Sequence, residues 1–153
     1  MAERNPMSET FHMRPATSPE DILKVMVVRG IVFIEEQQVA YEDEIDEYES
    51  ETWHFLGEVG GQPMAAGRLR QVPDGPMKVE RVAVRAAWRG RGYGKEVVDH
   101  LIAAATAKGV GRLAMHAQVH LRDFYADFGF VAQGEVFDEC GIDHVLMVRE
   151  GDR

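Results

Sequence analysis

One segment in the middle of the chain constrains the fold most, because a strand, a glycine-rich turn and a helix start follow one another there. The apolar run Val82–Val84 is typical of a buried strand, and Gly90, Gly92 and Gly94 follow it at alternate positions. Over Gly92–Lys108 the apolar residues recur at helical spacing. The segment therefore predicts a strand joined to a helix by a short glycine loop.

This loop is a candidate anion site, because the first N–H groups of a helix have no partner within the helix. Glycine allows close approach of the backbone to phosphate oxygens, and Arg89 and Arg91 add positive charge. The spacing does not fit a Walker loop, in which Ser or Thr follows the lysine, because Glu96 follows Lys95 here. The even spacing of the glycines also fails the G-x-G-x-x-G pattern of dinucleotide sites.

The strands before the glycine loop are expected to pair with their neighbours in sequence, whereas the strands after it are expected to alternate with helices. Ser18 is the expected cap of a first helix, with Pro19 in its first turn. Turn signals at 60–62 and 73–76 separate apolar runs, as in an antiparallel meander. The expected strands are 10–14, 53–59, 63–69, 79–84, 112–118, 130–135 and 144–149, with a short helix at 121–127. The pattern predicts a mixed sheet flanked by helices, in a single domain from 9 to 153 after a loose tail at 1–8.

Composition limits the partners. The chain of 153 residues has a formal net charge of −9, which disfavours nucleic acid and anionic membranes and favours a cationic partner such as an amine. Cys140 is the only cysteine, so no intrachain disulfide can form, and it is more simply a structural thiol than a nucleophile. Neither a signal peptide nor an apolar stretch of about 20 residues is recognisable, so a cytoplasmic protein is expected.

Two segments carry a resemblance to a known family. Arg89-x-x-Gly92-x-Gly94, after the strand, resembles the pyrophosphate-binding signature of the GNAT acetyltransferases. The segment Phe124–Phe130, FYADFGF, resembles the F-Y-x-x-x-G-F segment of the same superfamily. Shorter stretches at 32–37, 41–46, 117–118 and 141–144 are similar to the ElaA-like subgroup. The resemblance implies one α/β domain with a mixed, mostly antiparallel sheet of about seven strands and about four helices.

The resemblance also implies a reaction, in which an acetyl group moves from acetyl-CoA directly to a primary amine within a ternary complex. Gln118 is expected either to hydrogen-bond the cofactor or to shape the acceptor pocket. The residues expected to contact the cofactor are Val82, Ala83, Val84, Arg89, Gly90, Arg91, Gly92, Tyr93, Gly94 and Gln118. The acceptor could be a polyamine, an aminoglycoside, an amino-acid derivative or a lysine side chain, and a homodimer is a further expectation.

A protonated amine cannot attack a thioester, so the transfer requires a base and an acid. The resemblance implies that Tyr125 is the acid that protonates the departing thiolate; the alternative is that its ring only packs in the core. Glu80 is the candidate base, because it shares strand parity with Val82 and Val84 and should point to the same side. The alternative for Glu80 is an ion pair with a neighbouring Arg or Lys, in which case a carboxylate of the acidic run 41–51 or ordered water could deliver the proton to solvent.

The run Tyr41–Glu51 contains seven acidic residues and is expected to be a solvated loop or helix end. Alternatively, Glu44 and Asp46 lend charge to the mouth of an amine site. His116 and His120 are four residues apart, but they lack the zincin pattern, so no metal is expected. His144 is expected to be a buried or capping histidine, with a place in the acceptor site as the alternative.

Two functions from different classes fit these patterns. One is an active N-acyltransferase, and the other is a catalytically silent acyl-CoA-binding sensor or interaction module. The presence of both Tyr125 and the glycine loop favours the enzyme.

Overall fold

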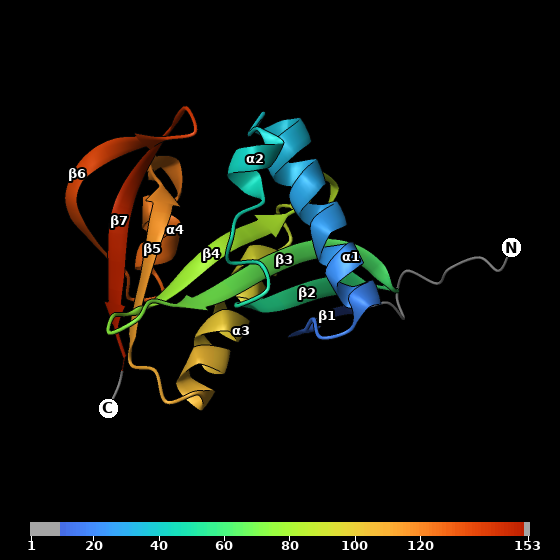
Figure 1. Ribbon diagram of the computed structural model, residues 1–153, viewed down its shortest axis with the longest axis horizontal. Helices are drawn as coiled ribbons and strands as arrows, with labels where there is room; N and C mark the ends of the chain where they lie inside the picture. The colour runs from blue at the N-terminus through green and yellow to red at the C-terminus, as the bar shows by residue number, and fades with distance from the viewer. Residues whose placement is uncertain (1–9, 152–153) are drawn as a thin grey trace, which may run out of the picture.

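A computed structural model describes residues 10–151, which form one seven-stranded sheet with helices on both faces (Figure 1). The expected tail at 1–8 lies outside the described residues. The strands are β1 (Phe11–Pro15), β2 (Trp53–Val59), β3 (Gln62–Gln71), β4 (Met77–Val84), β5 (Arg112–Gln118), β6 (Val131–Glu139) and β7 (Ile142–Glu150). The α-helices are α1 (Pro19–Arg29), α2 (Tyr41–Glu44), α3 (Tyr93–Ala107) and α4 (Arg122–Ala126). A π-helix (Gly30–Glu36) follows α1, and 3₁₀ turns occupy Ala86–Trp88 and Val119–Leu121.

The strand order is β1-β2-β3-β4-β5-β7-β6. All neighbours are antiparallel except β4 and β5, which are parallel. The mixed, mostly antiparallel seven-stranded sheet with four helices is therefore confirmed. The strand expected at 112–118 has the expected bounds, whereas β6 is longer than the expected 130–135 because it pairs with β7 as far as Glu139.

The helices cover opposite faces of the sheet and define two cores. On one face α1 packs against the central strands through Val25 and Val28, which are at most 1% exposed. On the other face α3 contributes Val97, Val98 and Leu101 to the larger core, all fully buried. The apolar spacing along each helix is what directs one face of it to the sheet.

Helix α1 begins as expected. The Ser18 hydroxyl accepts a hydrogen bond from the Asp21 N–H at 3.1 Å, and Pro19 occupies the first turn. The chain does not stop at Arg29 but continues into the π-helix, whose last residues lie near the site described below.

A bulge in β4 overturns the expected direction of Glu80. Glu80 lies opposite Arg68 and Ala83 lies opposite Ala66, so two residues of β4 face one residue of β3. One of the two is Arg81, whose φ of 55° is left-handed. The bulge reverses the side-chain alternation, so Val82 packs against the same core as Val79, three positions earlier. Glu80 therefore does not share a face with Val82 and Val84, and that prediction was wrong.

The parallel strands β4 and β5 pair only at their beginnings, through Met77 with Leu113 and Lys78 with Ala114. Beyond these pairs the two strands diverge, as Figure 1 shows. The inner edge of β4 from Val79 onward thus has no pairing with β5.

Candidate active site

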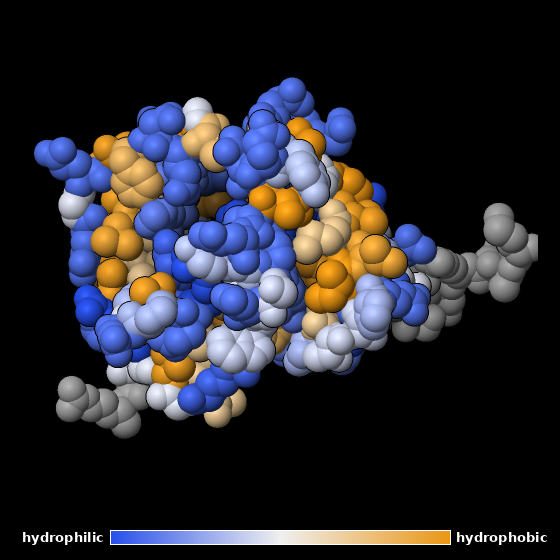
Figure 2. All heavy atoms as spheres, in the orientation of Figure 1, coloured by the Kyte–Doolittle hydropathy of each residue, from blue (hydrophilic) through white to orange (hydrophobic). Residues whose placement is uncertain are grey.

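A cavity of about 420 Å³ lies where β4 and β5 diverge. We call it the central cavity. Its lining comes from the segment after α1, from α2, from β4 and β5, and from the β6–β7 turn. Figure 2 shows a hollow between the lobe of β5, β6 and β7 and the lobe of α1 and α2, framed mostly by hydrophilic side chains.

The glycine turn lies at the end of β4 and exposes the beginning of α3. Gly90 and Gly92 have φ values of 79° and 82°, a conformation that L side chains rarely adopt. A Cβ at either position would have no heavy atom within 4 Å, so the space beside the turn is open. Gly92 is the N-cap of α3 and provides no side chain to cap it. The first N–H groups of α3 are therefore available to an anion.

The two arginines of the turn are placed differently. Arg89 donates from Nε to the Val84 carbonyl at 2.8 Å, and its terminal nitrogens pair with both carboxylate oxygens of Glu36. Arg91 is exposed and lies over the Trp88 ring, 5.4 Å from its centroid. Arg89 is thus engaged by a carboxylate 53 residues away, which the sequence pattern did not indicate.

The remaining expected cofactor residues border this turn. Val82 and Val84 are partly buried against the larger core, and Ala83 points to the other face, where it is 4% exposed. Tyr93 opens α3 with its ring stacked on Phe11. Gly94 follows in the first turn of α3, where an added Cβ would lie 3.6 Å from Phe124.

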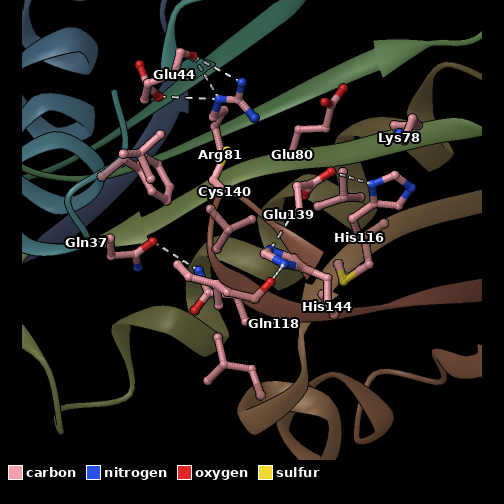
Figure 3. A pocket seen from close by; sticks show the side chains of 18 of the residues that line it. Gln37, Glu44, Lys78, Glu80, Arg81, His116, Gln118, Glu139, Cys140 and His144 are labelled. Atoms are coloured by element: carbon pink, nitrogen blue, oxygen red, sulfur yellow. Dashed lines mark hydrogen bonds and ion pairs between the residues drawn. The ribbon is translucent and has the colours of Figure 1, made fainter. Parts of the chain in front are cut away.

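Gln118, at the end of β5, lies in the lining of the central cavity. Its side-chain nitrogen donates to the side-chain oxygen of Gln37 at 3.0 Å (Figure 3). Gln37 directly follows the π-helix, so this bond connects the segment between α1 and α2 to the end of β5. Gln118 therefore shapes the cavity.

Tyr125 lies in α4 and reaches the central cavity with only 6% of its surface exposed. Burial raises the pKa of its phenol to about 12, so the phenol is protonated at neutral pH. Its ring also packs edge-on against Phe124 and Phe130. The side chain thus packs in the core and also contributes to the cavity lining.

Glu80 also lines the central cavity, but two arginines occupy its carboxylate. Arg70 donates to Oε1 at 2.6 Å and Arg68 donates to Oε2 at 3.0 Å. Burial opposes ionisation of this group, but the hydrogen bond from Arg70 and the charge of Arg68 outweigh it, so the pKa of Glu80 is lowered. The ion pair considered for Glu80 is present.

Arg68 connects Glu80 to a buried ionic cluster of arginines and acidic residues. Arg68 is fully buried and binds both carboxylate oxygens of Asp46, at 2.9 and 2.7 Å. Arg29, 1% exposed, donates to Glu44 at 2.7 Å and to both oxygens of Glu49. The expectation of a solvated acidic run is therefore wrong for Glu44, which is 2% exposed. Arginines distant in the sequence fold onto these acids and neutralise them.

Arg81, the bulge residue of β4, adds a third arginine to the acids of this cluster. It donates to the Glu44 carbonyl at 3.0 Å and to Asp46 at 3.2 Å. Asp46 and Glu44 both line the central cavity, but their negative charge is largely matched by these arginines.

Across the cavity from this cluster, β5, β6 and β7 bring together His116, Glu139 and His144 (Figure 3). Glu139 lies between the two imidazoles, 3.0 Å from Nδ1 of His116 and 3.6 Å from Nε2 of His144. His144 is 7% exposed, as expected for a buried histidine, and it lines the cavity; its place in an acceptor site stays a prediction. Glu139 was missed, because only the pairing of three strands places it there.

Within residues 10–151, no group of three or more His, Cys, Asp or Glu side chains is arranged to hold a metal ion. The thiol of Cys140 is exposed in the turn between β6 and β7 and borders the cavity. In the part of the chain that the structure describes, no helix has the length and apolar character needed to cross a membrane.

Solved structures share this architecture. The crystal structure of Escherichia coli ElaA superimposes with a TM-score of 0.81 at 27% identity, over 93% of this chain and 99% of the other. A GNAT family acetyltransferase from Elizabethkingia anophelis, solved with acetyl-CoA bound, has a TM-score of 0.66 at 17% identity over 92% and 97% of the two chains. The second likeness is one of fold alone.

The sequence comparisons agree. The family model of the Acetyltransferase (GNAT) domain matches residues 15–150, so the chain belongs to the GNAT acetyltransferase family. The uncharacterized N-acetyltransferase YjcF of Bacillus subtilis is 35% identical over 136 residues, covering 88% of this chain and 96% of YjcF. Protein ElaA of Escherichia coli is 31% identical over 137 residues, covering 87% and 90%. The resemblance to the ElaA-like subgroup is thereby confirmed.

Proposed function

We propose that the chain is an acetyl-CoA-dependent N-acetyltransferase that transfers the acetyl group directly to a primary amine. One observation carries the proposal: β4 separates from β5 after Lys78 and leads into the open glycine turn, and Tyr125 lines the cavity between the two strands. The glycine turn can bind a phosphate, the edge of β4 can bind an extended chain, and Tyr125 can protonate a leaving thiolate. Membership of an acetyltransferase family supports the same assignment.

The pyrophosphate is assigned to the backbone of the glycine turn and the first turn of α3. Arg89 is a weaker candidate than the sequence indicated, because Glu36 occupies both of its terminal nitrogens. Arg91 is exposed beside the turn and can add long-range attraction. The unpaired edge of β4 after Lys78 offers backbone groups to the extended part of the cofactor.

Tyr125 is assigned the role of acid. Its phenol holds its proton at neutral pH because burial raises its pKa to about 12. A thiolate that leaves the acetyl carbon can take this proton without the help of water.

Glu80 is assigned a structural role in place of the role of base. A base must accept a proton near neutral pH, whereas the pKa of Glu80 is lowered, with Arg70 and Arg68 on its two oxygens. Its carboxylate instead holds these two arginines beside the cavity.

Calorimetric titration with acetyl-CoA tests the assignment. Gly92→Glu adds a negative charge and a strained left-handed residue at the beginning of α3, and it should abolish binding. Gly109→Glu is the matched control: Gly109 has a φ of 78°, open space around it and a place just beyond the other end of α3. The control should bind like the wild type. If Gly92→Glu also binds unchanged, the phosphate assignment is wrong.

Release of free CoA thiol then distinguishes the enzyme from a silent acyl-CoA sensor. The wild type is incubated with acetyl-CoA and a panel of primary amines: polyamines, aminoglycosides, amino-acid derivatives and a lysine peptide. The enzyme releases thiol with at least one amine class, and Tyr125→Phe lowers the rate without weakening cofactor binding. Saturable binding without thiol release for any amine contradicts catalysis and supports the sensor.

A further inference from the structure

The proposed reaction requires a group that takes a proton from the acceptor ammonium, and Glu80 is held by arginines. The other polar side of the central cavity contains His144 on β7, Glu139 at the end of β6 and His116 on β5 (Figure 3). Strand pairing brings them together: His144 lies opposite Gln118 on β5 and opposite Phe137 on β6. The three side chains therefore share one face of this part of the sheet.

The hydrogen bonds of His144 fix which of its nitrogens is free. Nδ1 lies 2.7 Å from the Ile142 carbonyl, which can only accept, so Nδ1 carries the proton of the neutral ring. Nε2 is then the unprotonated nitrogen, 3.6 Å from Oε2 of Glu139. A proton taken up at Nε2 would face a carboxylate, which stabilises the resulting imidazolium.

Glu139 and His116 are far more exposed than His144. The side chain of His144 is 9% exposed, that of Glu139 is 44% exposed and that of His116 is 36% exposed. The other oxygen of Glu139 lies 3.0 Å from Nδ1 of His116. Together the side chains connect the buried part of the cavity to solvent through adjacent polar atoms.

We propose that His144 is the catalytic base of the proposed acetyl transfer, and that Glu139, held by the hydrogen bond from His116, passes the proton to solvent. This inference rests on the proposed function and adds the base to it. Nε2 removes one proton from the acceptor ammonium, and the freed lone pair forms the C–N bond at the acetyl carbon. When the C–S bond breaks, the sulfur receives the Tyr125 proton, and the second amine proton restores the phenol. The products are an amide, a thiol and one proton delivered to solvent.

The surroundings favour an ionised Glu139. The hydrogen bond from His116 is the largest influence that lowers the pKa of Glu139, and the charges of His144 and Lys78 act in the same direction. The other titratable or charged groups that line the cavity are Asp43, Glu44, Asp46, Arg70, Glu80, Arg81, Tyr125 and Cys140. Glu44, Asp46 and Glu80 pair with arginines, whereas Glu139 faces the two histidines and can hold an imidazolium.

The pH dependence of kcat/KM tests the inference, measured with acetyl-CoA and an amine that supports thiol release by the wild type. His144→Asn keeps a donor for the Ile142 carbonyl and removes Nε2. It should lower kcat/KM about 100-fold or more and remove the limb that rises with pH, while the Kd for acetyl-CoA stays unchanged. Added imidazole should restore part of the rate.

His120→Asn is the matched control, because His120 is exposed and outside the cavity lining, and it should leave the profile unchanged. His116→Asn changes an exposed residue and should slow the reaction less than His144→Asn. An unchanged rate and rising limb in His144→Asn, or loss of that limb in Glu80→Gln instead, overturns the inference.

Imidazole ¹⁵N NMR of the wild type provides a readout that does not depend on turnover. Neutral His144 should show its proton on Nδ1, and Glu139→Gln should change the imidazole ¹⁵N chemical shifts of both His144 and His116. A proton on Nε2, or ¹⁵N chemical shifts unchanged by Glu139→Gln, overturns the assignment. Failure of the wild type to bind acetyl-CoA would instead refute the proposed function. The NMR result would still show which nitrogen of His144 carries the proton and whether Glu139 contacts the two histidines.

Discussion

Replacement of Arg68 by methionine measures how much the buried ionic cluster contributes to folding. Arg68 is fully buried and pairs with Asp46, Glu49 and Glu80, at 2.7, 2.9 and 3.0 Å. Loss of one partner of a buried ion pair costs about 3–5 kcal/mol, because the other charge stays buried.

The lower end of this range applies here for two structural reasons. Each of the three carboxylates keeps another arginine: Arg81 for Asp46, Arg29 for Glu49 and Arg70 for Glu80. Arg68 also has a buried Nε without a hydrogen-bond partner, and methionine removes that unsatisfied group. We expect a loss of about 3 kcal/mol in the free energy of unfolding, or about 6–12 °C in Tm for a chain of this size.

Urea denaturation of the wild type and Arg68→Met at neutral pH provides the measurement. Lys95→Met is the control, because Lys95 forms an exposed pair with Asp99, and no measurable change is expected. A loss below about 1 kcal/mol for Arg68→Met would place the cluster among weak surface pairs and refute the reasoning.

The difference in the free energy of unfolding between wild type and Arg68→Met should also depend on pH. Burial opposes ionisation of Glu49, but Arg29 and then Arg68 outweigh it and hold its folded-state pKa at about 2, below the ordinary value of 4.5. A lowered folded-state pKa stabilises the protein above the unfolded pKa, and the contribution disappears as the pH falls through the folded value. The difference in the free energy of unfolding between wild type and Arg68→Met should therefore be largest above about pH 4.5 and decrease toward pH 2.

Three further results are expected. Tyr125→Phe should lower kcat about 100-fold at an unchanged Kd for acetyl-CoA, and spectrophotometric titration should show loss of the tyrosine that ionises near pH 12. Glu80→Gln should keep the rising limb of the pH–rate profile, because this carboxylate is already ionised well below neutral pH; disappearance of the limb would restore Glu80 as base. In urea denaturation, Gly57→Ala should cost about 1–3 kcal/mol, because its Cβ would lie 2.8 Å from the Ala65 Cβ, whereas Gly30→Ala in open helical space should not destabilise.

Local patterns in the sequence predicted the elements well. The cap at Ser18, the glycine turn and the strand 112–118 depend on residues close in sequence, so their signals survive without tertiary context. The seven-stranded sheet followed from the apolar runs together with the family resemblance.

The details of the site depend on tertiary pairing and were less accessible. No local signal marks Arg81 as a left-handed bulge residue, and that single residue reversed the direction predicted for Glu80. Arg89 and Glu36 are 53 residues apart, so their pairing follows only from the folded arrangement. The catalytic and cofactor assignments, and a homodimer, stay predictions.

The brief contact between β4 and β5 has a mechanical consequence. Two residue pairs, Met77 with Leu113 and Lys78 with Ala114, are the whole of the strand pairing between one half of the sheet and the other. An extended ligand in the gap beyond them would act as a replacement strand and couple the two halves. Occupancy should then slow amide hydrogen exchange on β4 and β5 together and raise the unfolding temperature of the entire domain.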